Sequence, residues 1–412
     1  MATIFVSKAG NDSNAGTSQG SPKLTIAAAV TAANTDGDTV EIIDEGTYAE
    51  SQIVVAADSI TLTHTASALG RPVINGSGLG STEIISLAPN GSTHRRSFTL
   101  NGIEVKGSGN SSQELFKHNN NSTNANGLTV TDCFVYEVAA FSNQFIQAGS
   151  GEAIRIKQSS FMFINASADA IKFAGSGQFL IENCFLSRSG ASSEFPILRS
   201  LNSTLNATAS FSTFIFNNVA SNPKTILTFP KVINCIVSGS GTNLDGIDAA
   251  DHTFNLVNVD GVAFRNGSGT SASLGTGETE NPVVFVDGTS AGNTFSVVQN
   301  FALTAGSPGV DQGTSFNSVN VDILGTTRPQ NGSFDIGAFE LNPPYWTDDD
   351  GSERFSRKFG PGLEIRGTAN MLDTRRFKRS KENRQSPFFV TISGPPTIKG
   401  QTPDGKPYKA ET

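Results

Sequence analysis

The sequence is poor in several features that would place it in well-known protein classes. It has no run of the roughly 18 uninterrupted apolar residues that a membrane-spanning helix needs, and residues 1–7 have no basic-then-apolar signal region. Its three cysteines form no Cys-x-x-Cys pair and its four histidines are unpaired in sequence, so no metal-ligand spacing is present. We therefore expect no membrane partner, no metal and no cofactor, and synthesis in a cytoplasm without secretion.

Charged residues are also scarce, at 16% of the chain, whereas glycine (42) and proline (17) are frequent. This composition favours many short strands joined by polar turns over helices. The net charge of −8 is divided unevenly. Residues 1–340 carry 16 basic and 28 acidic residues, a balance of −12, and residues 341–412 carry 13 basic and 9 acidic residues, a balance of +4. Two physically different segments therefore meet near residues 342–344.

One short pattern recurs along the body of the chain: an apolar residue, two of any type, a small or polar residue, one of any type, and a second apolar residue. Its fourth positions follow each other at steps of 32, 26, 25, 28, 23 and 25 residues. A period near 25 residues with strand-forming segments predicts a parallel β-helix, whereas a β-propeller blade needs roughly 40 to 50 residues. These fourth positions are Asn101, Cys133, Ser159, Cys184, Ser212, Cys235 and Asp260.

A second strand-like segment follows most copies of the pattern at a similar offset. Strands of four to six residues cannot bury a face alone, but they can when one coil stacks on the next. The stacking places equivalent residues of successive coils in columns. These second segments are residues 114–117, 144–147, 170–173, 196–199 and 225–229.

The three cysteines are spaced by 51 and 51 residues, which is two coils each. Adjacent coils lie about 4.8 Å apart, so consecutive cysteines would be roughly 10 Å apart, which is too far for a disulfide. We expect Cys133, Cys184 and Cys235 to be free, buried thiols in a column with Ser159 and Ser212.

Both ends of the body resemble those of a known superfamily. Residues 4–48, with Gly20-Ser-Pro22 and Gly46-Thr-Tyr48, match a common entry segment, and residues 305–340 look like a common closing coil. The sequence thus resembles the right-handed parallel β-helix, or pectate-lyase-like, superfamily, of the kind found in bacteriophage decoration proteins and tail spikes. The resemblance implies an all-β solenoid of roughly ten coils. It implies no single chemistry, because this superfamily holds lyases, hydrolases, adhesins and inert virion parts.

The expected organisation has three parts: an N-terminal strand and capping helix in residues 1–39, a β-helix body in residues 40–340 and an extended basic C-terminal anchoring arm in residues 341–412. Apolar residues at helical spacing predict a short helix over the first coil, with Ser21-Pro22 as its N-cap and first turn. At the other end we expect an ion-paired structural cap that closes the last coil. The helix residues are Ile26, Ala29, Val30 and Ala33, and the closing residues are Asp311, Asp322, Asp335 and Glu340 around Arg328.

Catalytic residues are not indicated. Residues 154–157 look like the Arg-Ile-Lys element of polygalacturonases, and residues 243–248 resemble their Asn-Thr-Asp element, but the two stand in reversed order and the other elements are missing. Arg155 and Lys157 alternate with apolar residues, so we expect them to face solvent. Of the scattered acids, only Asp132 and Glu182 share a strand face with Lys157, which is a weak signal for a lyase.

The C-terminal arm carries the predicted partner-binding residues. Residues 353–384 contain ten basic residues against four acids, and residues 386–393 form an apolar run that could add a strand to a partner's sheet. Alone, such a segment should be disordered. Nucleic acid is an unlikely partner because the attached body is acidic. The predicted binding residues are Arg354, Arg357, Lys358, Arg375, Arg376, Lys378, Arg379, Lys381, Arg384, Phe388 and Phe389.

These observations favour a structural bacteriophage protein displayed on the virion surface and bound through its arm to an acidic capsid or tail protein. We expect capsid decoration or cement, and otherwise a tail spike or fibre; a homo-oligomer such as a trimer and a host surface glycan remain open as partners. The alternatives are a polysaccharide lyase or glycoside hydrolase (a depolymerase) and a non-catalytic glycan-binding adhesin. Incubation with host capsular polysaccharide would distinguish them.

Overall fold

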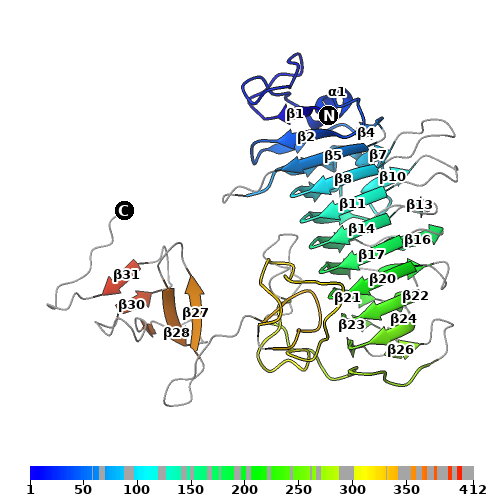
Figure 1. Ribbon diagram of the computed structural model, residues 1–412, viewed down its shortest axis with the longest axis vertical. Coiled ribbons are helices and arrows are strands. Elements are labelled where there is room, and N and C mark those ends of the chain that lie inside the picture. Colours follow the sequence, from blue (N-terminus) through cyan, green and yellow to red (C-terminus); the bar gives the residue numbers. More distant parts are fainter. Residues whose placement is uncertain are drawn as a thin grey trace. The chain divides into compact units, whose positions relative to one another are not determined.

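The computed structural model has two compact units, Met1–Leu341 and Asn342–Thr412, which are described separately (Figure 1). Among the described residues, no helix is long and apolar enough to cross a membrane. The structure describes residues 1–341 apart from 58, 65–69, 88–96, 119–126, 141–145, 149–152, 165–168, 176–177, 190–195, 201–205, 220–223, 242–244, 260–261, 266–270, 287–300 and 331, and, beyond residue 341, the five strands given below.

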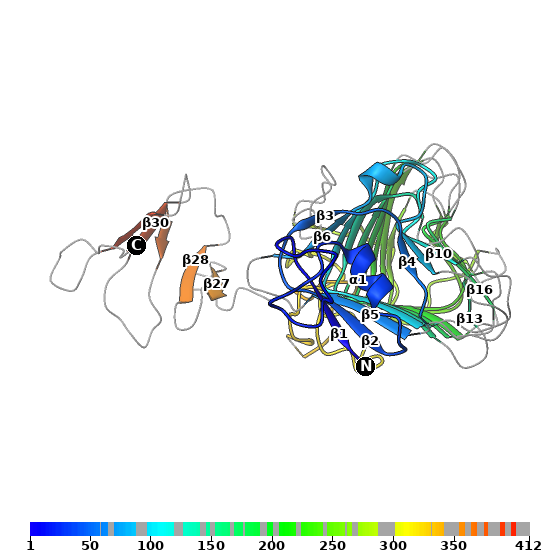
Figure 2. The ribbon, with the colours of Figure 1, turned by 90° about the horizontal axis from the view of Figure 1, so that it is seen from above.

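The first unit is a stack of coils, each of which contributes parallel strands to three faces (Figure 2). Sheet A runs along the whole stack, and each of its strands pairs in parallel with the strands of the coils before and after it. Its strands are β1 (Thr3–Val6), β2 (Asp38–Ile42), β5 (Ser59–His64), β8 (Ser97–Asn101), β11 (Gly127–Thr131), β14 (Ala153–Lys157), β17 (Gln178–Glu182), β20 (Asn206–Ser210) and the ends of β22 (Lys224–Ile233) and β24 (Asp245–Thr253).

Sheet B follows sheet A in each coil, from β8 on after a very short turn, and it is parallel throughout. Its strands are β3 (Thr47–Ala49), β6 (Val73–Asn75), β9 (Glu104–Lys106), β12 (Phe134–Val138), β15 (Ser160–Phe163), β18 (Phe185–Ser189), β21 (Thr213–Val219), β23 (Ile236–Gly241) and β25 (Leu256–Asn258). A single 3-10 turn, η1 (Ser77–Leu79), follows β6.

The third face, sheet C, has two sections. In the later coils β22 and β24 run without a break from sheet C into sheet A. The first section is β4 (Ile53–Val55), β7 (Ile85–Leu87) and β10 (Phe116–His118), and the second is β13 (Ile146–Ala148), β16 (Ile171–Gly175), β19 (Leu198–Ser200), the starts of β22 and β24, and β26 (Phe264–Arg265). The all-β parallel β-helix predicted from the repeat is confirmed.

Alternation along each strand builds the core, because every second side chain points into the stack. On sheet A the same inward position is occupied in successive coils by Leu62, Leu100, Val130, Ile156 and Ile181, which lie in register and are completely buried. Aliphatic residues therefore pack on aliphatic residues of the next coil along the axis. Each copy of the sequence repeat contributes one residue to this column.

The turn between sheets A and B explains the small or polar position of the repeat. From β8 on, the residue just before this position has a left-handed backbone, with φ of 53° at Asp132 and 53° at Asn183. The predicted column of free cysteines and serines is confirmed: Cys133 N and Cys184 N donate to Ser159 Oγ and Ser212 Oγ, both at 3.1 Å. Serine and cysteine are small enough to fill this tight interior corner.

Two members of the predicted pattern are wrong. The register pairs Asn101 with Thr131, so the residue equivalent to Cys133 is Ile103. In the last coil Asn255, whose Oδ1 accepts from Cys235 N at 2.9 Å, takes the place expected for Asp260. The pattern missed these two coils because their true frames do not fit it: Ile103 stands where a small or polar residue is expected, and His252 where an apolar one is expected.

The N-terminal helix α1 (Ile26–Ala32) covers the open end of the first coil, as predicted (Figure 2). Its predicted inward residues Ile26, Ala29, Val30 and Ala33 are all buried. The predicted Ser21-Pro22 cap is wrong, because the backbone around Pro22 instead bonds to Asn11 and Phe5. Thr25 is the N-cap, and the Glu50 carboxylate accepts from Ile26 N at 2.9 Å and Ala27 N at 3.1 Å.

Residues 301–341, here called the strap, form the ion-paired cluster that the sequence predicted but not the expected cap. The strap, drawn in yellow and orange in Figure 1, lies along the outward side of sheet B. It goes there because that side of sheet B is apolar in these coils, with Phe134, Met162, Phe185 and Ile215 buried against it. Residues 271–286 close the last coil instead, through the bonds Phe254 N to Thr276 O and Val257 N to Thr279 O.

The second unit contains short antiparallel strands, whereas its composition predicts disorder for an isolated segment. β27 (Arg354–Lys358) pairs with β28 (Glu364–Thr368), and β30 (Phe388–Thr391) lies between β29 (Arg375–Phe377) and β31 (Thr397–Gly400). The apolar run predicted to be a strand in residues 388–392 is β30.

Candidate functional site

The predicted partner-binding residues fall on three strands of the second unit. Arg354, Arg357 and Lys358 are in β27, Arg375 and Arg376 in β29, and Phe388 and Phe389 in β30. The antiparallel register places Arg376 opposite Phe389 and Phe377 opposite Phe388, so it brings basic and aromatic positions of two separate segments together. The remaining predicted residues, Lys378, Arg379, Lys381 and Arg384, lie outside the described residues.

The outward side of sheet A carries the residues that resemble a polygalacturonase element. Arg155 is exposed while Ile154 and Ile156 are completely buried, as predicted. Lys157 Nζ lies 2.9 Å from Glu182 Oε1 on the next coil. Asp132, the other acid on this side, pairs with Arg71. The lysine and the two acids thus form two separate ion pairs rather than a shared catalytic centre.

The cysteine column offers no reactive thiol. Burial raises the pKa of Cys133, Cys184 and Cys235 to about 12 in each case, so the thiols stay protonated at neutral pH. Each sulfur also lies near a backbone carbonyl of its own turn, for example Cys184 Sγ at 3.2 Å from Glu182 O.

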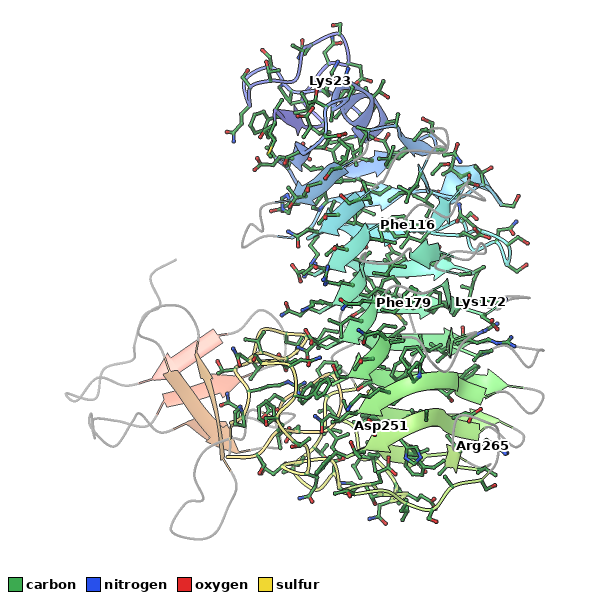
Figure 3. The ribbon with its side chains drawn as sticks, turned by 45° about the vertical axis from the view of Figure 1, so that its right-hand side comes forward. Lys23, Phe116, Lys172, Phe179, Asp251 and Arg265 are labelled. Carbon is green, nitrogen blue, oxygen red and sulfur yellow. The ribbon has the colours of Figure 1, made fainter. Side chains whose placement is uncertain are left out.

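A cluster of ionisable side chains that sequence reasoning did not single out lies at the corner of sheets B and C. This sheet C ion cluster consists of Asp169, Lys172, Arg188 and Arg199. The Asp169 carboxylate is only 2% exposed, and its Oδ2 lies 3.4 Å from Arg199 NH1 and 3.9 Å from Lys172 Nζ. Arg188, from β18, is completely buried and donates to Pro196 O at 3.1 Å. Figure 3 labels Lys172 on the outer side of the stack.

Burial governs the electrostatics of this cluster. It raises the pKa of Asp169, an effect opposed by Arg199 and Lys172, and it lowers the pKa of Arg188 to about 10, which Asp169 opposes. Arg188 therefore keeps its charge at neutral pH. Among the described residues, no hydrogen-bond donor reaches Asp169 Oδ1. The carboxylate therefore has an acceptor oxygen left over after contacting both outer cations.

The chemistry available to the sheet C ion cluster is recognition of an anion. Lys172 and Arg199 are partly exposed, lie opposite each other on adjacent strands, and both are cationic hydrogen-bond donors. A carboxylate, sulfate or phosphate group could be bound there, with Asp169 holding the two cations in place. Within the described part of the chain, no group of three or more histidine, cysteine, aspartate or glutamate side chains could hold a metal ion.

A signal for this cluster was present in the sequence. The second strand-like segments 170–173 and 196–199 were recognised, but their register was not. The observed register pairs Ile171 with Leu198, which places Lys172 beside Arg199. Pairing Ile171 with Leu198 rather than with Ile197, both of which are apolar, places the two cations in one outward column.

No family model and no curated protein matches this chain. Among solved structures it is similar to pectate lyase Pel9A, with 13% identity and a TM-score of 0.34 over 83% of this chain and 97% of that one. It is also similar to the GH136 lacto-N-biosidase from Eubacterium ramulus (9% identity, TM-score 0.30, 68% and 67% covered) and to ORF18 of Geobacillus virus E2 (11%, 0.28, 94% and 75%). Likenesses this distant assign no residue a role, because one fold hosts many chemistries.

Proposed function

We propose that this protein is a structural component of a bacteriophage particle, displayed on its surface and attached through the second unit. The observation that carries the proposal is the division of one chain into two compact units of opposite charge, −12 in residues 1–340 and +4 in residues 341–412. An acidic body and a basic unit favour different surroundings. The basic unit suits an acidic protein surface, and the acidic body is repelled from that same surface.

The construction of the body supports a passive, projecting role. Its interior is one continuous column of buried apolar residues, and its parallel strands bond from coil to coil along the whole stack. A solenoid of this kind is stiff and resists local opening, because each coil is held by its two neighbours. Stiffness and resistance are useful in a particle that must survive outside a cell.

The proposed partner is an acidic capsid protein, which makes the chain a decoration or cement protein; a tail spike or fibre is the alternative location. The second unit would bind with the basic positions of β27 and β29, and with β30, whose aromatic positions lie opposite β29. Charge-assisted contacts from arginine to carboxylate are suited to such a surface.

Charge reversal in the full-length chain tests this proposal. Particles lacking the protein are incubated with wild type, Arg376→Glu or the matched control Arg155→Glu, and bound protein is quantified after sedimentation. Arg376→Glu should lower occupancy several-fold, more strongly at low salt, and the Arg155→Glu control should bind like wild type. Equal occupancy of all three proteins would contradict attachment through the second unit.

A second candidate function, binding or cleavage of an acidic surface glycan, is favoured by the sheet C ion cluster, because Lys172 and Arg199 offer donors to a sugar carboxylate. The protein would be incubated with host capsular polysaccharide and examined for reducing ends, unsaturated ends and binding. New ends would indicate a depolymerase, and binding without new ends an adhesin. Either activity should be lost in Arg199→Leu.

A further inference from the structure

We propose that the strap is a pH-sensitive latch on sheet B, which holds the chain where it leaves the β-helix body and loosens when carboxyl groups in its interior ionise. The inference concerns the first unit alone and does not depend on the proposed function. It rests on the way in which residues 301–341 are attached to sheet B and on the buried charges that give the strap its own fold.

The strap is attached to the body by apolar and by polar contacts. Phe301, Ile323 and Phe339 pack on the outward side chains of sheet B, and the rings of Phe185 and Phe301 lie 4.9 Å apart. The left-handed turn residues of three coils reach outward to the strap backbone. Asn183 Nδ2 donates to Val321 O at 2.6 Å, Gln158 Nε2 donates to Asp322 O, and Asn234 both donates to and accepts from Thr314.

The interior of the strap contains one buried cation surrounded by carboxyl groups. Arg328 is 4% exposed, and its guanidinium donates to Asp335 O at 3.1 Å and Gly337 O at 2.8 Å. Glu340 Oε2 lies 3.6 Å from Arg328 NH1. Asp322 and Asp335 are each 1% exposed, and Asp311 lies at the margin, where its backbone N–H donates to Asp335 Oδ1. Full ionisation would leave three buried carboxylates against a single guanidinium.

These carboxyl groups hold the backbone at the point where the chain leaves the body. Asp322 Oδ2 accepts from Glu340 N at 3.0 Å, and Asp335 Oδ2 accepts from Leu341 N at 2.5 Å. Glu340 in turn accepts from Gln330 N and Asp335 N. Leu341 is the last residue of the first unit, so weakening of this network would release the end of the strap first.

The charge state of the network changes near neutral pH. Burial raises the pKa of Glu340 to about 7, with a further contribution from Asp335, and it also raises the pKa of Asp322 and Asp335. Because these values are raised in the folded state, the stabilisation is fully present below the unfolded pKa values and is lost as pH rises through the folded ones. Among the described residues, Arg328 and Asp335 are the charged groups that act on Glu340, Asp322 accepts from its backbone N–H, and Asp311 acts on Asp335.

Hydrogen exchange of the full-length protein tests the latch. Protection factors, which divide out the intrinsic pH dependence of exchange, are measured at pH 6 and pH 8.5 for peptides covering residues 332–341 and, as an internal reference, β14. A shift of the Glu340 pKa from 4.5 to about 7 raises the opening constant of the strap about tenfold between these pH values. The reference peptide should keep its protection.

Two variants distinguish titration from general fragility. Glu340→Gln removes the titrating group but places an amide nitrogen against Gln330 N or Asp335 N, so its strap should lose protection at both pH values and lose the pH dependence. The matched control Glu280→Gln, at an exposed position, should retain the wild-type protection and pH dependence. A wild-type strap with the same protection at both pH values would overturn the proposal, and so would an unchanged pH dependence in Glu340→Gln. If Glu340→Gln does not fold, the wild-type comparison decides the question alone.

Discussion

The outward faces of sheets A and B belong to the same coils and follow the same register, but they meet different surroundings. On sheet A one outward column reads Thr39, Thr61, Thr99 and Thr129, all half-buried. On sheet B the outward side chains lie in two columns, and Phe134 and Phe185 of one and Met162 and Ile215 of the other are buried beneath the strap. The inward residues determine the coil, and the outward ones determine what covers each face.

This difference explains why the end of the body folds back along its side. Left uncovered, these phenylalanine, methionine and isoleucine side chains would expose an apolar patch, which soluble proteins rarely leave open. Threonine on sheet A needs no cover, because its hydroxyl stays hydrated while its methyl group suits a strand. Among the described residues of these coils, we find only sheet B apolar on its outward side. The strap lies on that side.

The largest effect is expected from removing an anchor of the covered face. Phe185→Ala takes away a completely buried ring that contacts Phe301 and belongs to the same apolar cluster as Ile323 of the strap. By analogy with other buried aromatic residues, the free energy of unfolding should fall by about 3–5 kcal/mol. Urea denaturation followed by circular dichroism would measure the loss. A change below about 1 kcal/mol would mean that the strap does not hold this face.

The interior corner between sheets A and B should be more sensitive to a change in side-chain volume than to a change in side-chain polarity. Cys184→Leu adds bulk to a completely buried turn and should cost about 1–3 kcal/mol. The matched variant Cys184→Ser should cost less, because Ser159 and Ser212 occupy the same column and donate to Lys157 O and Ser210 O. The same denaturation measurement applies, and a more damaging serine would contradict our account of the column.

The extent to which the sequence predicts this molecule follows from the range of each interaction. The coil period and the cysteine column depend on contacts repeated from coil to coil, and the buried helix face depends on local helical spacing, so their patterns are visible in the chain. The position of the strap depends on Asn183 and Asn234 meeting residues 138 and 80 positions away, and no local pattern records such pairs. The sheet C ion cluster is an intermediate case between these visible and invisible features. The correct register of two neighbouring strands would have been enough to place Lys172 beside Arg199.

A smaller, pH-dependent effect is expected where the last coil is closed. His252 Nδ1 lies 2.9 Å from Glu278 Oε2, and this hydrogen bond raises the pKa of His252, against the effect of burial and with help from Asp251. The stabilisation is present below the unfolded histidine pKa of about 6.5 and is lost as pH rises through the folded value. Urea midpoints should therefore fall between pH 5.5 and 8.5 by more in wild type than in His252→Gln. Equal slopes would show that this pair does not titrate with folding.

The smallest effect is expected on the uncovered face, and it is the sharpest test of the comparison. Arg155 projects from the middle of sheet A into solvent, in the same column as Thr129, and it is exposed. Arg155→Ala removes neither a buried ring nor a buried charge, so the free energy of unfolding should change by no more than about 0.5 kcal/mol. If Arg155→Ala were instead as damaging as Phe185→Ala, sheet A would have to be covered in solution, for example by a second copy of the chain. Sedimentation velocity would reveal such an association, and a monomer with a stable Arg155→Ala variant leaves sheet A as a free outer surface of the proposed particle component.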